Sequence, residues 1–147
     1  MDSHAFGVAI RWLHVAAMAV AFGGAVLLAV AARSRSATAN GVIDVAYSYE
    51  RAFWVAAGIL VMTGVGNAAA FGAELPAPSS AWGSAFLLKL EAVGALLVLS
   101  VPRTVTLAHL GVSAERARLP TAVSWLYGST AAGLLLILAL AIRLAHG

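Results

Sequence analysis

The sequence has no cysteine and few charged residues, and both absences narrow the kinds of protein that it can encode. A chain without cysteine forms neither disulfides nor thiolate metal sites. Charged residues make up 10% of the sequence, whereas about a quarter of an ordinary soluble domain is charged. Apolar residues make up 62%, and the mean hydropathy is +0.93. Because a 15.0 kDa chain cannot enclose so much apolar surface, the sequence predicts that much of it faces lipid.

The net charge of +3 and the isoelectric point near 10.0 do not indicate nucleic-acid binding. The basic residues stand at the ends of the hydrophobic segments instead of forming one patch, which is typical of membrane proteins. Arg11 and the apolar run that follows it, which closes on small residues at Ala32, are similar to a secretory signal peptide. The residues before Arg11 are not basic, however, and we interpret this run as a retained span.

Four segments are long and apolar enough to predict membrane-spanning helices, since one span needs about 20 apolar residues. We expect helices at about 12–32, 42–71, 82–110 and 121–145, within a single domain over residues 1–147. Pro102 either kinks the third helix or ends its span. Pro76 and Pro78 prevent the connection before that helix from being helical throughout. The predicted fold class is therefore all-α, an integral membrane four-helix bundle.

The arginines predict the orientation of the bundle. Two connections on one side of the membrane carry Arg33, Arg35, Arg51, Arg103, Arg116 and Arg118. The side that bears both termini has Arg11 and Arg143, and six against two predicts that both termini are extracytoplasmic. Arg51 and Arg103 are interpreted as topology determinants. The expected location is a bacterial or archaeal inner membrane, in which the chain is a multi-pass protein.

Tryptophans at both ends of the predicted spans agree with this orientation. Trp12 and Trp82 fall at the outer interface, and Trp54 and Trp125 fall at the inner one. Small residues are expected to form the helix contacts, as in the four-residue spacing of Ala17, Ala21 and Ala25.

Polar side chains within the spans are the candidate functional residues, because such groups are expensive in lipid. Those near the outer surface are Arg11, His14, Asn67, Lys89, Glu91 and Arg143. Lys89 and Glu91 lie about 200° apart around a helix, so only one of them can face a given pocket. On the inner side, Glu50, Arg51, Arg103 and His109 form a second polar layer.

His14 supports two cofactor hypotheses and one without a cofactor. It suits an axial position on haem, with Arg11, Lys89 or Arg143 neutralising the propionates. Alternatively, His14 and Met18, with Met62 as a third ligand, suit copper(I), which prefers soft donors. Without a cofactor, His14 is an interfacial imidazole bonded to Asn67 or to a carbonyl, and Lys89 snorkels to the surface.

Two other classes of site do not fit the sequence. Two bis-histidine haems need four histidines on facing helices, but the second helix has none and the fourth has His146 alone, at its extreme end. No serine, histidine and carboxylate fall at one depth, so a catalytic triad is not expected. The roles of Glu91 and His109 stay open, and so does the question of whether the protein is an enzyme.

Short motifs in three of the helices resemble those of CopD-domain proteins, the copper resistance protein D family. Arg-Trp-Leu-His at 11–14, followed by Phe-Gly-Gly at 22–24, is similar to the first helix of that family. Tyr-Glu-Arg-Ala at 49–52 and Thr-Gly-Val-Gly-Asn-Ala at 63–68 resemble its second helix. Trp-Gly-Ser-Ala-Phe-Leu-Leu-Lys-Leu at 82–90 resembles its third helix.

The related HemJ-type membrane proteins, protoporphyrinogen oxidases thought to bind haem b, share a histidine in the first helix and a lysine in the third. His14 and Lys89 match those positions. The resemblance implies a four-helix unit in which these two residues face each other, with haem b or copper as the associated chemistry. After the first helix, HemJ-type proteins have an Arg-Leu-aromatic run and a second histidine, where this chain has Ala-Ala-Arg-Ser-Arg-Ser.

Three functional hypotheses follow. The first is a membrane protein that binds haem b near the outer face, for electron transfer or for oxidation of a membrane-soluble substrate. The second is a copper-binding or copper-transporting protein, and the third is a cofactor-free accessory subunit of a membrane complex. The expected partners are the lipid bilayer and either a membrane redox partner or further copies of the chain. Both cofactor hypotheses require His14 and Lys89 to share a cavity beneath the extracytoplasmic surface.

Overall fold

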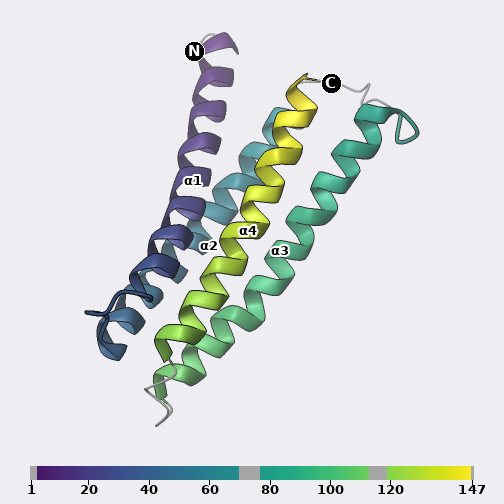
Figure 1. Ribbon diagram of the computed structural model, residues 1–147. Helices are drawn as coiled ribbons and strands as arrows, with labels where there is room; N and C mark the ends of the chain where they lie inside the picture. The colour runs from purple at the N-terminus through teal and green to yellow at the C-terminus, as the bar shows by residue number, and fades with distance from the viewer. Residues whose placement is uncertain (1–2, 70–76, 113–118, 147) are drawn as a thin grey trace.

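The protein folds into four antiparallel helices, each running nearly the full length of the molecule (Figure 1). The computed structural model describes residues 3–69, 77–112 and 119–146. The helices are α1 (Ser3–Ala31), α2 (Ala39–Ala69), α3 (Ala81–Val112) and α4 (Leu119–His146). Both termini lie at the same end of the bundle, and we call this the terminal end (Figure 1). The all-α four-helix architecture expected from the sequence is confirmed.

The helices are longer than predicted at most of their ends. The largest difference is at α1, which begins at Ser3 and not at residue 12, because helical hydrogen bonding continues beyond the apolar run that set the prediction. α3 continues through Pro102 to Val112, in agreement with the predicted helix at 82–110, so this proline does not end the helix. The predicted end of the second helix at residue 71, together with Pro76, Arg116 and Arg118, lies outside the described residues.

Side-chain caps fix where two of the helices begin. Thr38 precedes α2, and its hydroxyl oxygen accepts a hydrogen bond from the Gly41 amide at 3.2 Å. Ser80 precedes α3, and its hydroxyl oxygen accepts one from the Gly83 amide at 2.9 Å. Each cap satisfies an amide that has no partner within the helix, which explains why these helices start where they do.

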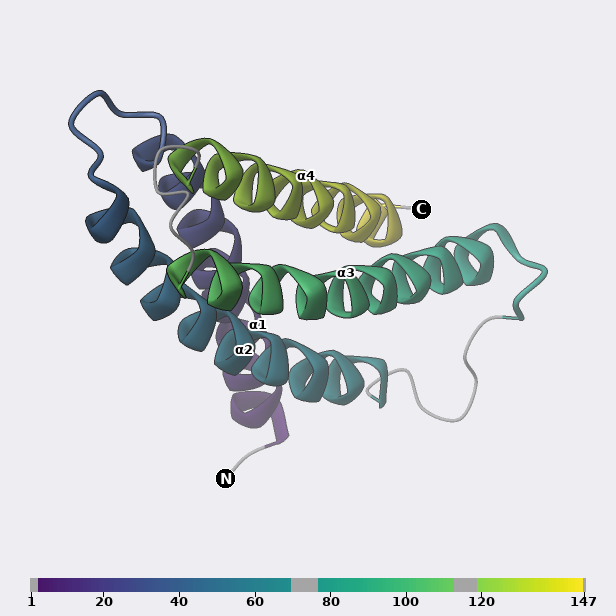
Figure 2. The same ribbon diagram turned by 90° about the horizontal axis from the view of Figure 1, so that it is seen from below.

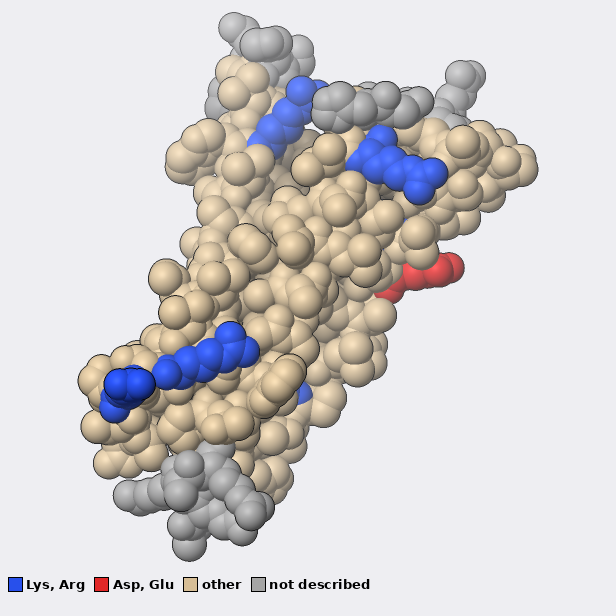
Figure 3. All heavy atoms as spheres, in the orientation of Figure 1, with Lys and Arg blue, Asp and Glu red and all other residues tan. Residues whose placement is uncertain are grey.

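Three of the helices are long and apolar enough to cross a membrane, as in a multi-pass membrane protein: Ala5–Ala31, Ala81–Leu110 and Leu119–Ala145. In α2 the polar first half lowers the hydropathy, but from Ala52 to Asn67 the helix contains no charged residue. On the face drawn in Figure 3, Lys and Arg side chains lie toward the two ends. The surface between them is uncharged except for an acidic group at its edge.

Small residues on α1 make the closest helix contacts. Ala17, Ala21 and Ala25 are all buried, as the four-residue spacing predicts. Gly24 lies so close to the aromatic ring of Tyr49 on α2 that an added Cβ would stand 2.5 Å from the Cε2 atom of the ring. This close approach lets the Tyr49 hydroxyl donate a 2.7 Å hydrogen bond to the carbonyl oxygen of Ala21. The contact fastens α2 to α1.

Candidate functional site

A cavity of about 390 Å³ lies between the four helices. Within residues 3–69, 77–112 and 119–146, the lining is apolar except for His14 on α1 and Lys89 on α3. The apolar lining residues are Met18, Ala21, Phe53, Ala57, Leu60, Val61, Gly64, Val65, Phe86, Leu90, Val93, Leu96, Leu97, Leu134 and Ile137. A concave, mainly apolar space of this size with a few polar groups is the usual form of a small-molecule site.

A hydrogen bond fixes the protonation pattern of His14. The Nδ1 atom lies 2.7 Å from the hydroxyl oxygen of Thr63 on α2, and that hydroxyl donates to the carbonyl oxygen of Ile59 at 2.6 Å. We assign Nδ1 of a neutral imidazole as the donor to Thr63, since this assignment leaves the hydroxyl proton for the carbonyl within α2. The lone pair of the neutral ring is then on Nε2, the atom that a metal ion would bind. Histidine ligands of metals are commonly fixed through the other nitrogen in this way.

Lys89 and Glu91 point in different directions, as their spacing predicts. Lys89 is partly buried and lines the cavity, whereas Glu91 is exposed on the outside of α3. At 1.5 Å per residue, Lys89 lies about 12 Å from the first residue of α3. Its ammonium is within electrostatic range of the His14 ring. The cavity therefore carries one cationic group and one imidazole among otherwise apolar walls.

Of the other residues predicted for the site, one lines the cavity and the rest lie outside its lining. Met18 lines the cavity together with His14. Arg11, Asn67 and Arg143 do not line it, and both arginines are exposed. Met62 is 76% exposed and also lies outside the lining, so the expectation that it completes a copper site with His14 and Met18 is not supported.

In the alternative without a cofactor, Asn67 or a carbonyl was the hydrogen-bond partner suggested for His14, and the structure places a different side chain against Nδ1. The partner is Thr63, which stands four residues before Asn67 and therefore on the same face of α2. The sequence contained a usable signal, because a threonine inside an apolar helix regularly bonds the carbonyl four residues earlier and keeps an acceptor free. Within the described part of the chain, no cluster of three or more His, Asp or Glu side chains forms a metal site.

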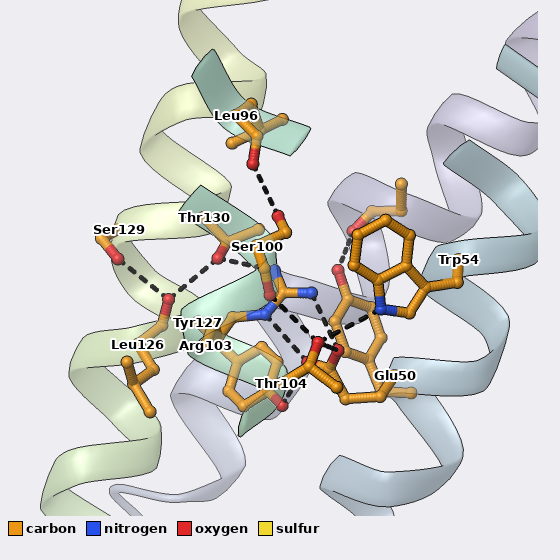
Figure 4. A network of polar contacts seen from close by, with 12 residues as sticks. Glu50, Trp54, Leu96, Ser100, Arg103, Thr104, Leu126, Tyr127, Ser129 and Thr130 are labelled. Carbon is orange, nitrogen blue, oxygen red and sulfur yellow. Dashed lines mark hydrogen bonds and ion pairs between the residues drawn. The ribbon is translucent and has the colours of Figure 1, made fainter. Parts of the chain in front are cut away.

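A buried ion pair lies on the other side of the cavity from the terminal end (Figure 4). Arg103 on α3 donates from Nε to Glu50 Oε1 on α2 at 2.8 Å, and from Nη2 to Oε2 at 3.1 Å. Both residues are 4% exposed. The interpretation of Arg103 as a topology determinant is therefore corrected, because its charge is paired inside the bundle with a carboxylate from another helix.

Hydrogen bonds from neighbouring side chains complete this pair. Glu50 also accepts from the hydroxyls of Thr104 at 2.6 Å and Tyr127 at 2.7 Å. Arg103 donates from Nη1 to the hydroxyl of Thr130 on α4 at 2.9 Å. We call this set, with Trp54 bonded to Thr104 at 3.1 Å, the Glu50–Arg103 network (Figure 4). A buried ion pair is tolerated only when its remaining donors and acceptors are satisfied, and here they largely are.

Phe53 connects the network to the cavity. The Arg103 guanidinium carbon lies 4.2 Å from the centre of the Phe53 ring, a cation–π contact, and Phe53 itself lines the cavity. Phe53 is 1% exposed. The network therefore closes the end of the cavity that lies away from the terminal end. His109, near the last residue of α3, is exposed.

Comparison with protein-family models, curated proteins and solved structures gives no match to this chain.

Proposed function

We propose that the chain is an integral membrane protein with four spans and both termini on the extracytoplasmic side of a cell membrane. Three helices with spanning length and hydropathy support the proposal, and so does the uncharged second half of α2. Arg33 and Arg35 are exposed at the end opposite the termini, in agreement with the positive-inside rule, and Arg51 is exposed in the first half of α2. Arg103 no longer counts toward that charge difference, because Glu50 neutralises it.

We further propose that the cavity binds haem b, with His14 as axial ligand and Lys89 as partner of a propionate. The observation that carries this proposal is the apolar cavity that His14 and Lys89 share. The donor set fits: Nε2 of His14 bears the lone pair, and Lys89 supplies a positive charge for a carboxylate. Bound haem b would supply one-electron redox chemistry, for electron transfer or for oxidation of a membrane-soluble substrate.

Residues of this chain would hold such a group in defined ways. Thr63 keeps the His14 ring in one orientation and one tautomer. Apolar side chains such as Phe86 and Leu134 exclude water from the cavity walls. Phe53, held beneath by Arg103, closes the cavity at the end away from the termini. Arg11 and Arg143, exposed near the terminal end, are available to a carboxylate that reaches out of the cavity.

Copper(I) is the second candidate, because His14 and Met18 both line the cavity and offer an imidazole and a thioether. The charge of the cavity argues against it. Of the described residues that line it, Lys89 alone is charged, and an ammonium repels a metal cation but attracts an anion. A path for ions along the bundle is also blocked below the cavity, where Phe53, Glu50 and Arg103 are buried.

The test is the absorption spectrum of the purified protein after haem supplementation. Wild-type protein is expected to show a Soret band, His14→Ala to lose it, and Lys89→Gln to retain it with weaker haem affinity. Met62→Leu is the matched control, because Met62 is exposed and outside the cavity. A wild-type protein without a Soret band, or an unaltered band in His14→Ala, would remove the haem proposal.

Metal analysis of the same preparations separates the alternatives. Stoichiometric copper that disappears in Met18→Leu supports the copper site. Protein that holds neither haem nor copper, tolerates His14→Ala and copurifies with a partner supports a cofactor-free accessory subunit.

A further inference from the structure

The cavity is enclosed by two of the helices and open at the other two. Its lining residues on α1 and α4 are buried or partly buried, including Ala21 at 1% and Leu134 at 3% exposure. On α2, by contrast, Val61 is 45% exposed and Val65 is 66% exposed, and on α3 Leu90 is 50% exposed. All three of these side chains line the cavity. The opening is therefore on the side of the bundle, between α2 and α3.

The hydrogen bonds between helices explain why the opening is there. α2 and α3 are joined by the Glu50–Arg103 network, and the two helices lie close together at that level (Figure 2). Toward the terminal end they separate (Figures 1 and 2). At that end, the described hydrogen bonds join α1 to α2 through His14 and Thr63, and α3 to α4 through Trp82 and the carbonyl of Leu144.

We propose that the ligand of this cavity passes directly between the bilayer and the cavity, through the opening bordered by Val61, Val65 and Leu90. We propose also that this ligand is a lipid-soluble molecule with an apolar body and an anionic group that pairs with Lys89. The inference rests on the proposed membrane location, because only there does the side opening face lipid. It names the route and the ligand chemistry, and it does not require that the ligand be haem.

Solvation favours this route over one through water. The three bordering side chains are aliphatic, so an apolar molecule that crosses them from lipid leaves no hydrocarbon exposed to water. The charged group of a lipid-soluble anion lies near the membrane interface. Lys89 is about 12 Å along α3 from its first residue, at the terminal end, so its long side chain lies within reach of that interface. A carboxylate can therefore reach the ammonium while its apolar body remains in the acyl region. Among the described residues that line the cavity, none offers a carboxylate to the ammonium of Lys89.

The absence of cysteine from the chain makes the route testable with single labels. Val65→Cys carries a bulky maleimide at the opening, and Leu99→Cys carries the same label on α3 at an exposed position outside the cavity. The probe is dansyl-labelled undecanoic acid in nanodiscs, whose fluorescence rises as it enters an apolar site. Labelling Val65→Cys is expected to slow this rise severalfold relative to the same variant unlabelled, and labelling Leu99→Cys to leave it unchanged.

The anionic requirement is tested with the methyl ester of the same probe. Lys89→Gln is expected to weaken binding of the acid about tenfold or more, the size of a lost charge-assisted hydrogen bond, and to leave the ester unaffected. Equal rates in labelled and unlabelled Val65→Cys would overturn the lateral route. Equal affinity of the wild type for acid and ester would overturn the anionic ligand. Because the probe contains no haem, a failed Soret test leaves both results interpretable.

Discussion

At the scale of single residues, the orientation of the His14 ring is set by its hydrogen bond to the hydroxyl of Thr63. Thr63 can accept from Nδ1 because its own proton is donated to the carbonyl of Ile59. We expect Thr63→Val to weaken haem binding about 10–100-fold, since it removes the acceptor that orients the ring. Thr63→Ser keeps the hydroxyl and should restore most of the affinity. Haem titration followed by absorbance measures both, and equal affinities for Thr63→Val and wild type would show that the contact is not used.

Gly24 offers a second residue-scale prediction, with its control in the adjacent position. A Cβ at Gly24 would stand 2.5 and 2.6 Å from two ring carbons of Tyr49, whereas one at Gly23 would have no atom within 4 Å. We expect Gly24→Ala to destabilise the fold by about 1–3 kcal/mol, because the ring must move and its hydrogen bond to Ala21 is strained. Gly23→Ala should be nearly neutral. Denaturant unfolding in detergent measures the difference, and similar values for the two variants would contradict the packing described.

At the scale of helices, the Glu50–Arg103 network connects α2, α3 and α4 around two opposite charges. We expect Glu50→Leu or Arg103→Met alone to cost about 3–5 kcal/mol, since each leaves the other charge buried without its partner. The double variant should cost less than the sum of the two, because no unpaired charge remains. Unfolding titrations of the four proteins form a double-mutant cycle. Strict additivity would mean that the ion pair does not couple these helices.

The helices themselves were predictable, and their pairing was not. Apolar runs identify all four helices, of which three are long and apolar enough to span lipid, because hydropathy depends on composition alone. The length of α1 was underestimated, since the helix begins at Ser3, well before Trp12, whereas the predicted third helix at 82–110 already ran through Pro102 and nearly matches α3. Glu50 and Arg103 were placed in one polar layer by depth, but depth does not reveal direction. Whether an arginine faces water or a carboxylate on another helix depends on the rotation of both helices.

The same reasoning explains which site residues the sequence could identify. His14 and Lys89 stood out because polar groups within apolar helices are rare, and helix spacing separated Lys89 from Glu91. Arg11, Asn67 and Arg143 were selected by depth as well, but they lie outside the cavity lining. Thr63 was part of a recognised motif, and its contact with His14 depends on the rotation of α2 against α1.

At the scale of the whole molecule, both termini lie at one end and the arginine-rich turn after α1 lies at the other. Ser36→Cys in that turn and Ser79→Cys before α3 are exposed reporters in a chain that has no cysteine. In intact cells, a membrane-impermeant maleimide is expected to label Ser79→Cys, and to label Ser36→Cys only after permeabilisation. The reverse pattern would invert the proposed orientation, and labelling of both from outside would contradict a spanning arrangement.

The unequal distribution of helix contacts along the bundle has a consequence for its motions. Near the Glu50–Arg103 network, side-chain hydrogen bonds join α2, α3 and α4. The backbone amides of this region should therefore exchange slowly with deuterium. Toward the termini, hydrogen bonds pair α1 with α2 and α3 with α4. A molecule bound between these two pairs would contact both of them and so connect them. A bound ligand should therefore slow exchange chiefly in that half of the bundle, so a deuterium map would locate the ligand before it is identified.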